Sequence, residues 1–181
     1  MIIQKDNKAL RKSAEEIADI KSTDIKTLIK KMAEAMFAEP DGIGIAAPQI
    51  GVSLRIFLVA GNVLRMDAKS QAGKTQPSSK SDFPGKSDFF PGGARDFLVF
   101  INPIIKKYSV KKANDIEGCL SVRGLYGEVI RPEKLTVEYF DENGKKQKRG
   151  ASGLLARVIQ HEVDHLNGIL FIDKAKNLRK L

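Results

Sequence analysis

The spacing of apolar side chains along the chain predicts its main helices. Residues 23–38 carry apolar side chains at steps of three and four, the period of a helix with one buried face. Three residues can cap its start: Ser22, Thr23 and Asp24. The stretch Pro40–Gly42 ends it. Residues 153–166 show the same period, and a shorter helix is predicted over residues 8–18.

Other apolar positions follow the pattern of strands. Residues 54–60 and 97–103 are short apolar runs between breakers, which is typical of buried strands. Residues 134–140 and 145–152 flank the sequence Asp-Glu-Asn-Gly, which favours a hairpin turn. Strands that precede a helix, without a β-α-β alternation, indicate an α+β fold. We therefore expect antiparallel or mixed sheets packed around the helix that carries HEVDH, with N-terminal helices and a short C-terminal helix starting at Asp173.

One segment departs from these patterns. Residues 67–96 are rich in Lys, Ser, Gly, Pro and Gln, show no periodicity, and contain a near repeat, KSDFPG followed by KSDFFPG. Such a segment is too polar to add to a core. We therefore expect residues 1–181 to form a single domain with a polar insertion loop at about 61–96, mobile at the surface. The alternative is a lid or docking role for its aromatic side chains, Phe83, Phe89 and Phe90.

Composition narrows the class of protein. A hydrophobic share of 42% suits a globular chain, and no apolar run approaches the roughly 20 residues that span a bilayer. The first residues turn charged almost at once, so they predict no signal peptide. The single cysteine, Cys119, excludes an internal disulfide. Together these features predict a cytoplasmic protein that does not work at a membrane.

The net charge of +9 allows two interpretations. It could mark a surface that binds polyanions such as RNA, or the lysines could simply keep the protein soluble. The basic residues are scattered and do not alternate with aromatic residues, as they would in a platform for stacked bases. We therefore favour the role in solubility and expect no sequence-specific nucleic-acid partner.

The candidate chemistry begins at HEVDH, residues 161–165. Residues four apart share a helix face, so His161 and His165 can converge on one metal ion. Glu162 lies about 100° further round the helix, where it flanks the ion and can act as a base on water. The alternative is an ordinary amphipathic helix, but these are the only two histidines in the chain. Their spacing favours a metal site.

A third protein ligand has to come from elsewhere in the chain. The residues after His165 contain no His, Glu or Cys, and their only carboxylate is Asp173. Metalloproteases with this helix take their third ligand from that side, so a zinc endopeptidase would lack one. Cys119 lies upstream in EGCLSV. A lone buried cysteine is more often a small hydrophobe, but beside an incomplete site we interpret it as the third ligand, which leaves a fourth position open for catalysis.

A further element, GIGIAAPQIG at residues 42–51, consists largely of small side chains. They would let the backbone lie against an extended peptide, although a tight helix-to-strand connection is the plain alternative. GIGIAAPQIG, EGCLSV and QHEVDHLNG, in this order and at these separations, resemble the three signature motifs of the peptide deformylase family. That family removes the formyl group from the N-terminal formyl-methionine of new bacterial and organellar polypeptides. The likeness covers most of the chain outside residues 61–96.

The resemblance implies a metal centre and its support. The ligands would be Cys119, His161 and His165. Glu162 would accept a proton from water and pass it to the departing amine. Asp164 would pair with Arg131 on a preceding strand, outside the ligands. The ligand set suits Fe²⁺ or Zn²⁺; the family favours Fe²⁺ in the cell, with Zn²⁺, Ni²⁺ or Co²⁺ as substitutes.

The resemblance also implies how the substrate is held. The side-chain amide of Gln49 and the backbone N–H of Leu120 would stabilise the oxyanion. The backbone of Ile43 and Gly44 would pair with an N-formylmethionyl peptide. This sequence departs from the family pattern in three places: it has no proline near residues 6–12, Arg123 stands where a proline is common after EGCLSV, and it carries the insertion.

The last residues are basic and suggest a partner. Lys174, Lys176, Arg179 and Lys180 fall in a tail that we expect to be helical, and some deformylases dock on the ribosome through a C-terminal helix. We expect weak ribosome association, with a solvated helix end as the alternative. Two other functions stay open at this point: a zinc endopeptidase, and a basic ribosome- or RNA-binding protein whose metal site is vestigial.

Overall fold

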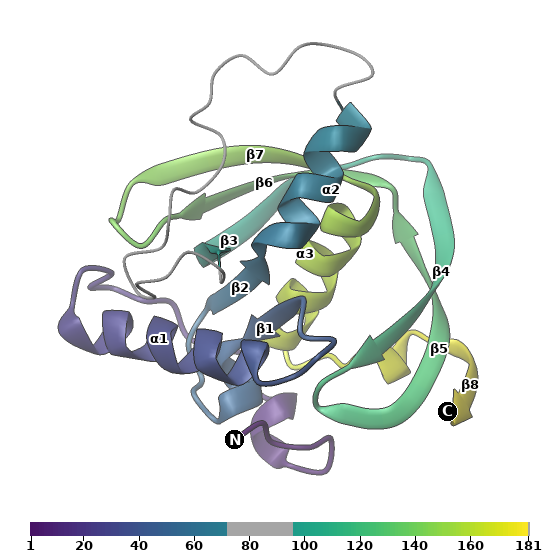
Figure 1. The fold of residues 1–181 in the computed structure, drawn as a ribbon, viewed down its shortest axis with the longest axis horizontal. Helices are drawn as coiled ribbons and strands as arrows, with labels where there is room; N and C mark the ends of the chain where they lie inside the picture. Colours follow the sequence, from purple (N-terminus) through teal and green to yellow (C-terminus); the bar gives the residue numbers. More distant parts are fainter. Residues whose placement is uncertain (72–95, 181) are drawn as a thin grey trace.

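The computed structural model describes residues 1–71 and 96–180 (Figure 1). The helices are α1 (Thr23–Phe37), α2 (Gly61–Gln71) and α3 (Gly153–Leu166). Short 3-10 turns are η1 (Lys8–Arg11), η2 (Ala47–Ile50) and η3 (Phe171–Asp173). The strands are β1 (Gly44–Ala46), β2 (Ile56–Ala60), β3 (Phe97–Tyr108), β4 (Lys112–Cys119), β5 (Val122–Pro132), β6 (Lys134–Phe140), β7 (Lys146–Ser152) and β8 (Lys176–Lys180).

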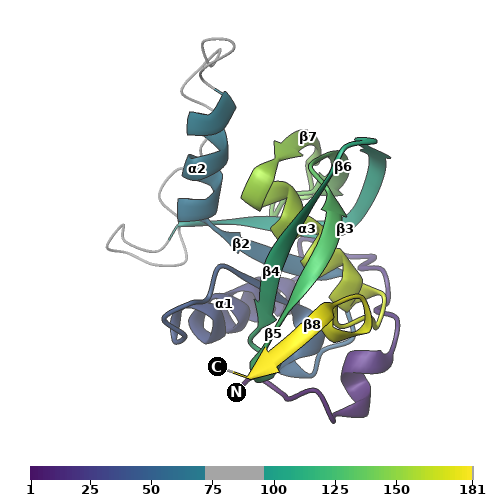
Figure 2. The same ribbon diagram turned by 90° about the vertical axis from the view of Figure 1, so that its right-hand side faces the viewer.

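The strands form two antiparallel sheets. One has the order β1-β2-β3-β6-β7 and the other has the order β4-β5-β8. Helix α3 lies between the two sheets, and α1 lies beside β1 and β2 (Figures 1 and 2). The α+β prediction is confirmed, and so are the hairpin of β6 and β7 and the helices over 23–38 and 153–166. Of the three candidate caps of α1, Ser22 is the one whose side chain accepts a bond from the helix, from the N–H of Ile25 at 3.3 Å.

Helices cover both faces of the five-stranded sheet at its strand β2, which explains the continuous apolar run of that strand. In β2, Phe57 and Val59 pack toward α3, whereas Ile56, Leu58 and Ala60 pack toward α1. All five side chains are buried. Successive side chains of a strand point to opposite faces, so a strand between two helical layers has no polar positions.

The prediction of a helix over residues 8–18 is wrong beyond its first turn. Only Lys8–Arg11 is helical, as a 3-10 turn. The N–H of Ala14 donates to the carbonyl of Leu166 at 2.8 Å, and the N–H of Glu15 donates to the carbonyl of Ser53 at 2.9 Å. These tertiary partners satisfy the backbone, so the segment stays extended instead of forming helical bonds.

The start of the polar insertion is also different from the prediction. Residues 61–71 form α2, which buries Val63 and Leu64. Asp67 accepts bonds from the N–H and hydroxyl of Ser152, at 3.1 and 2.8 Å, so α2 is joined to the residue that precedes α3. Three aromatic residues lie outside the described residues: Phe83, Phe89 and Phe90.

The prediction of a C-terminal helix is wrong. Asp173 ends the 3-10 turn η3 instead of starting a helix, and Lys176–Lys180 is the strand β8, antiparallel to β5. The physical reason is the neighbouring strand. A helix of five residues cannot support itself in water, whereas β5 offers its edge as a ready partner for backbone hydrogen bonds.

Candidate metal centre

The two histidines of HEVDH lie side by side on α3, as their spacing predicts. Their ring centroids are 4.9 Å apart and the rings are nearly perpendicular, at 81°. His165 is fully buried, and the side chain of His161 is 12% exposed. Both rings come from the last two turns of α3, where the helix lies between the two sheets (Figure 1).

Cys119 completes the cluster from the three-stranded sheet. It is the last residue of β4, where the chain turns into β5. Its Sγ lies 3.2 Å from Nε2 of His165. One potential ligand atom from each of Cys119, His161 and His165 lies within 4.8 Å of the others, and in the described residues these three form the only such group. The predicted return of the distant cysteine to the histidine pair is therefore what the fold produces.

The chemistry of the cluster fits a metal ion. Nδ1 of His161 lies 3.0 Å from a carboxylate oxygen of Glu117, so Nε2 of the same ring is the atom that can bind a metal ion. The Sγ of Cys119 accepts bonds from the N–H of Ser121 at 3.4 Å and from the side-chain amide of Gln49 at 3.5 Å. Nδ1 of His165 is buried without a partner among the described residues. A thiolate with two imidazoles is a donor set for Zn²⁺ or Fe²⁺.

The pKa values of the two histidines are shifted in opposite directions. Burial would lower the pKa of His161, but hydrogen bonds to Cys119 and Glu117 outweigh it and raise the pKa to about 10. Burial and the charge of His161 hold the pKa of His165 well below its ordinary value. A proton on His161 balances the surrounding anions, and a divalent ion would supply that charge and displace the proton.

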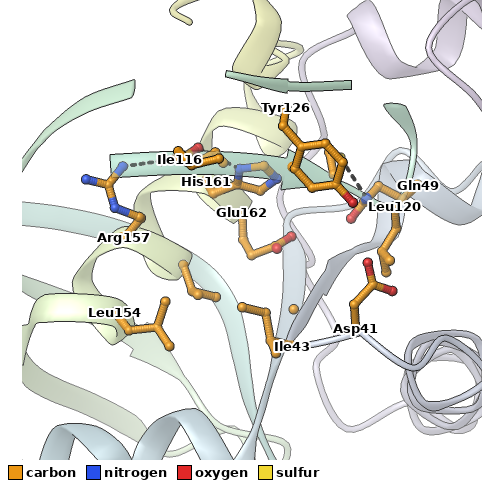
Figure 3. A pocket seen from close by; sticks show the side chains of 15 residues that line it. Asp41, Ile43, Gln49, Ile116, Leu120, Tyr126, Leu154, Arg157, His161 and Glu162 are labelled. Carbon is orange, nitrogen blue, oxygen red and sulfur yellow. Dashed lines mark hydrogen bonds and ion pairs between the residues drawn. The ribbon is translucent and has the colours of Figure 1, made fainter. Parts of the chain in front are cut away.

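Glu162 lies in the middle of the cavity beside the cluster (Figure 3). It is 3% exposed, and its Oε2 has no hydrogen-bond partner among the described residues. Burial raises the pKa of Glu162 to about 7. The neighbouring Gly44 leaves it room: a Cβ added there would lie 2.5 Å from Oε1 of Glu162, closer than real contacts allow.

The remaining predicted substrate-contacting residues line the same cavity, which has a volume of about 200 Å³. They are Ile43, Gly44, Gln49 and Leu120. Gln49 is fixed by its own bonds: its Oε1 accepts from the N–H of Ala46 at 2.8 Å, and its amide nitrogen donates to Ser121 at 3.2 Å as well as to Cys119. Figure 3 shows Leu120, Asp41 and Tyr126 at one end of the cavity and Leu154 with Arg157 at the other.

The comparisons with known proteins agree with this geometry. A sequence model of the polypeptide deformylase family matches residues 1–181. The chain is 39% identical to a peptide deformylase of Picosynechococcus over 94% of this chain and 76% of the relative. It resembles the crystal structure of a Synechococcus elongatus peptide deformylase in complex with actinonin, with a TM-score of 0.74, 33% identity, and coverage of 98% and 79% of the two chains. It also resembles the structure of a Plasmodium falciparum peptide deformylase complex with an inhibitor. The TM-score is 0.74, the sequence identity is 32%, and the match covers 98% of this chain and 90% of the other.

The chain belongs to the polypeptide deformylase family. Its activity is the metal-dependent removal of the N-formyl group from nascent peptides, and it is a hydrolase of protein biosynthesis. The endopeptidase and RNA-binding alternatives are therefore set aside. None of the helices in residues 1–71 and 96–180 has the length and apolar character that a membrane span requires.

In this deformylase the expected pair of Arg131 and Asp164 is present, with Nη1 of Arg131 2.8 Å from Oδ2 of Asp164. Sequence reasoning missed two residues connected to this pair: Glu117, which binds Arg131, and Arg157, which binds Glu117. Glu117 is two residues before Cys119 on β4, and Arg157 is four residues before His161 on α3. The spacing of Arg157 from His161 could have pointed to Arg157, because residues four apart share a helix face. No such rule points to Glu117, because the pairing of β4 is irregular between Glu117 and Cys119.

Arg123 has a clear structural role where the family commonly has proline. Its guanidinium forms an ion pair with Glu39. Glu39 follows α1, and Arg123 lies at the start of β5, so the pair joins the segment before β1 to the segment after Cys119. Both segments border the cavity, which Asp41 and Leu120 line.

Proposed function

We propose that Cys119, His161 and His165 hold one divalent ion and that residues 1–181 form a single catalytic domain around it. When bound, the ion supplies Lewis acidity, which acidifies water and polarises the formyl carbonyl. The convergence of the three donor atoms and the nearby Glu117 support this assignment. We expect Fe²⁺ as the natural ion, with Zn²⁺, Ni²⁺ or Co²⁺ as substitutes, because the family favours Fe²⁺; the thiolate and imidazole ligands by themselves suit Fe²⁺ and Zn²⁺ alike.

Glu162 serves as the general base and then as the general acid. Its carboxylate accepts a proton from water as the water oxygen bonds to the formyl carbon, and it returns the proton to the amine nitrogen as the C–N bond breaks. Formate and a free amino terminus are the products. A pKa near 7, raised by burial, suits a group that both accepts and donates a proton near neutral pH.

Gln49 and Leu120 stabilise the oxygen that becomes negative during this step. Bonds to Ala46 and Ser121 fix the amide of Gln49 beside Cys119, and its second N–H, which donates to Cys119, is the one that would turn to the oxyanion. The backbone N–H of Leu120 is the second donor. Ile43 and Gly44 precede and begin the edge strand β1, where an N-formylmethionyl peptide can add as a further strand.

The convergence of Cys119 with the histidine pair beside Glu162 carries this proposal. The test is formate release from formyl-Met-Ala by protein prepared without oxygen and assayed for bound iron. We expect one ion per chain, formate as the product, and no cleavage of internal peptide bonds. Glu162→Gln should keep the ion and lose the activity, whereas a variant that retains the activity would contradict the role of Glu162.

We also propose that the enzyme works in the cytoplasm on chains that leave the ribosome, with weak ribosome association through its basic C-terminal strand. Lys176 and Lys180 in β8 are exposed, whereas Lys174 is bonded to Asp164 at 2.6 Å. The test should therefore spare Lys174. Co-sedimentation with ribosomes at low salt should weaken when Lys176, Arg179 and Lys180 are changed to Gln, and unchanged co-sedimentation would contradict the proposal.

A further inference from the structure

Arg157 is buried beside the candidate metal ligands, but its guanidinium cannot itself bind a metal ion. It is 8% exposed, an unusual position for an arginine. Its guanidinium donates to the carboxylate of Glu117 at 2.7 Å, to the carbonyl of Val129 at 2.9 Å and to the carbonyl of Ala113 at 3.0 Å. These bonds join α3 to both β4 and β5, so Arg157 links the helix to the sheet that carries Cys119.

The carboxylate of Glu117 is held from several sides. Arg131 donates to it through Nε at 2.6 Å and through Nη2 at 2.9 Å. Arg157 approaches the same Oε1 that Nε of Arg131 binds, while Oε2 lies 3.0 Å from Nδ1 of His161. Bonds from two arginines and the contact with a histidine therefore fix the position of this carboxylate.

The contacts of Glu117 and of Cys119 both reach α3. Arg157 and His161 are one helical turn apart on that helix. The pairing of β4 with β5 is irregular between Glu117 and Cys119, but both side chains reach the histidines: Glu117 lies 3.0 Å from Nδ1 of His161, and Sγ of Cys119 lies 3.2 Å from Nε2 of His165. The contact between Arg157 and Glu117 thus lies next to the contact between His161 and Cys119. We therefore expect a change in the contact of Arg157 with Glu117 to alter the separation and direction of the atoms of His161 and Cys119.

We propose that Arg157 is a positioning residue for the deformylase reaction, which holds Glu117 against Nδ1 of His161 and keeps β4 at a fixed distance from α3. The inference rests on the proposed function of the cluster. Arg131 reaches Glu117 from the paired strand β5 and joins that strand to α3 through Asp164. Arg157 adds the direct bond from α3 to Glu117 on β4, one helical turn before His161. Outer hydrogen bonds of this kind orient a ligand ring and typically change metal affinity about 10- to 100-fold when removed.

The test uses protein reconstituted with Co²⁺, whose visible bands and thiolate charge-transfer band report on ligand geometry. Arg157→Met should shift the visible bands and release Co²⁺ to a chelator about 10-fold faster or more. It should lower kcat while KM changes little. Arg157→Lys, which keeps one charge but not the three bonds, should give intermediate values. Arg65→Met removes an arginine whose side chain is 52% exposed and should match the parent protein.

The outcomes separate the inference from the proposed function. Bands, release rate and kcat equal to those of the parent would overturn the role of Arg157, and so would a change in KM alone, which would make Arg157 a substrate contact in the cavity. If Arg157→Met does not fold, Arg157→Lys decides: it must differ from the parent in its Co²⁺ bands. A parent protein that binds Co²⁺ through Cys119 but releases no formate would instead contradict the proposed function.

Discussion

Different forces hold the two sheets against α3. The five-stranded sheet is joined to the helix by apolar packing, and its strand β2 buries all five of its side chains. The strand β4 of the other sheet has eight residues, of which Glu117 alone is buried. That side chain is a carboxylate bound to two arginines.

The two kinds of interaction contribute differently to the stability of the fold and to the position of the side chains. Apolar packing is non-directional and contributes stability roughly in proportion to the area that it buries. Charged hydrogen bonds in a buried setting contribute little net stability but require a defined geometry. Cys119 lies on the sheet that is placed by directional bonds, and we infer that the geometry of the metal centre depends on those bonds more than on the apolar core.

Replacing Glu117 should have the largest effect. Glu117→Ala leaves Arg131 and Arg157 buried without their shared anion, so we expect a loss of about 3–5 kcal/mol in the free energy of unfolding, measured by chemical denaturation. The Co²⁺ bands should change as well. Glu133→Ala is the control, because its ion pair with Lys111 is exposed and should be worth less than about 1 kcal/mol. Equal effects of the two changes would contradict the account.

A core substitution should separate the two properties. Leu58→Ala removes a fully buried side chain on the α1 side of β2, and we expect a loss of about 3 kcal/mol in stability. Below its denaturation midpoint the variant should keep the Co²⁺ bands of the parent, because none of the bonds around Cys119 is altered. Bands changed as strongly as in Glu117→Ala would show that apolar packing also sets the geometry of the centre.

A methyl group at Gly44 should disturb the base without disturbing the metal. Because the added Cβ would lie 2.5 Å from Oε1 of Glu162, the carboxylate has to move. We expect kcat/KM for a formylated peptide to fall about 100-fold with the metal content unchanged. Gly150→Ala, where an added Cβ meets no atom within 4 Å, should retain full activity. Activity of Gly44→Ala equal to the parent would contradict the assigned position of the base.

The smallest effect is expected at Lys174, the most exposed member of the charged network that it forms with Asp164, Arg131, Glu117 and Arg157. Lys174 donates to both carboxylate oxygens of Asp164, but its side chain is 41% exposed and Asp164 keeps Arg131. Lys174→Met should cost only about 0.5–1 kcal/mol in stability, and the difference from the parent should shrink in high salt. A loss as large as that of Glu117→Ala would mean that the network behaves as one unit.

The elements that the sequence predicts well are those with a local cause. The histidine spacing places both rings on one face of α3, and the run of five apolar residues defines β2. The sequence between β6 and β7 predicts their hairpin, because its turn residues suit a tight connection. In each case, neighbours within a few residues determine the structure.

The elements that escaped prediction depend on distant partners. The strand β4 is mostly polar and exposed, so it has no apolar alternation, and it exists because β5 pairs with it. The strand β8 needs the free edge of β5, and residues near Ala14 are extended because Leu166 accepts their hydrogen bond. The return of Cys119 to the histidines could be inferred only by elimination and by resemblance, whereas Arg157 and Glu117 became visible with the fold.

The most direct test of the central claim is a Co²⁺ titration of the parent protein followed in the near ultraviolet. Cys119 is the only cysteine in the chain, so any thiolate-to-cobalt charge-transfer band must come from it. We expect that band to saturate at one Co²⁺ per chain and to be absent from Cys119→Ser. Tight binding of Co²⁺ by the parent without such a band would contradict the claim that the sulfur from β4 completes the site begun by His161 and His165.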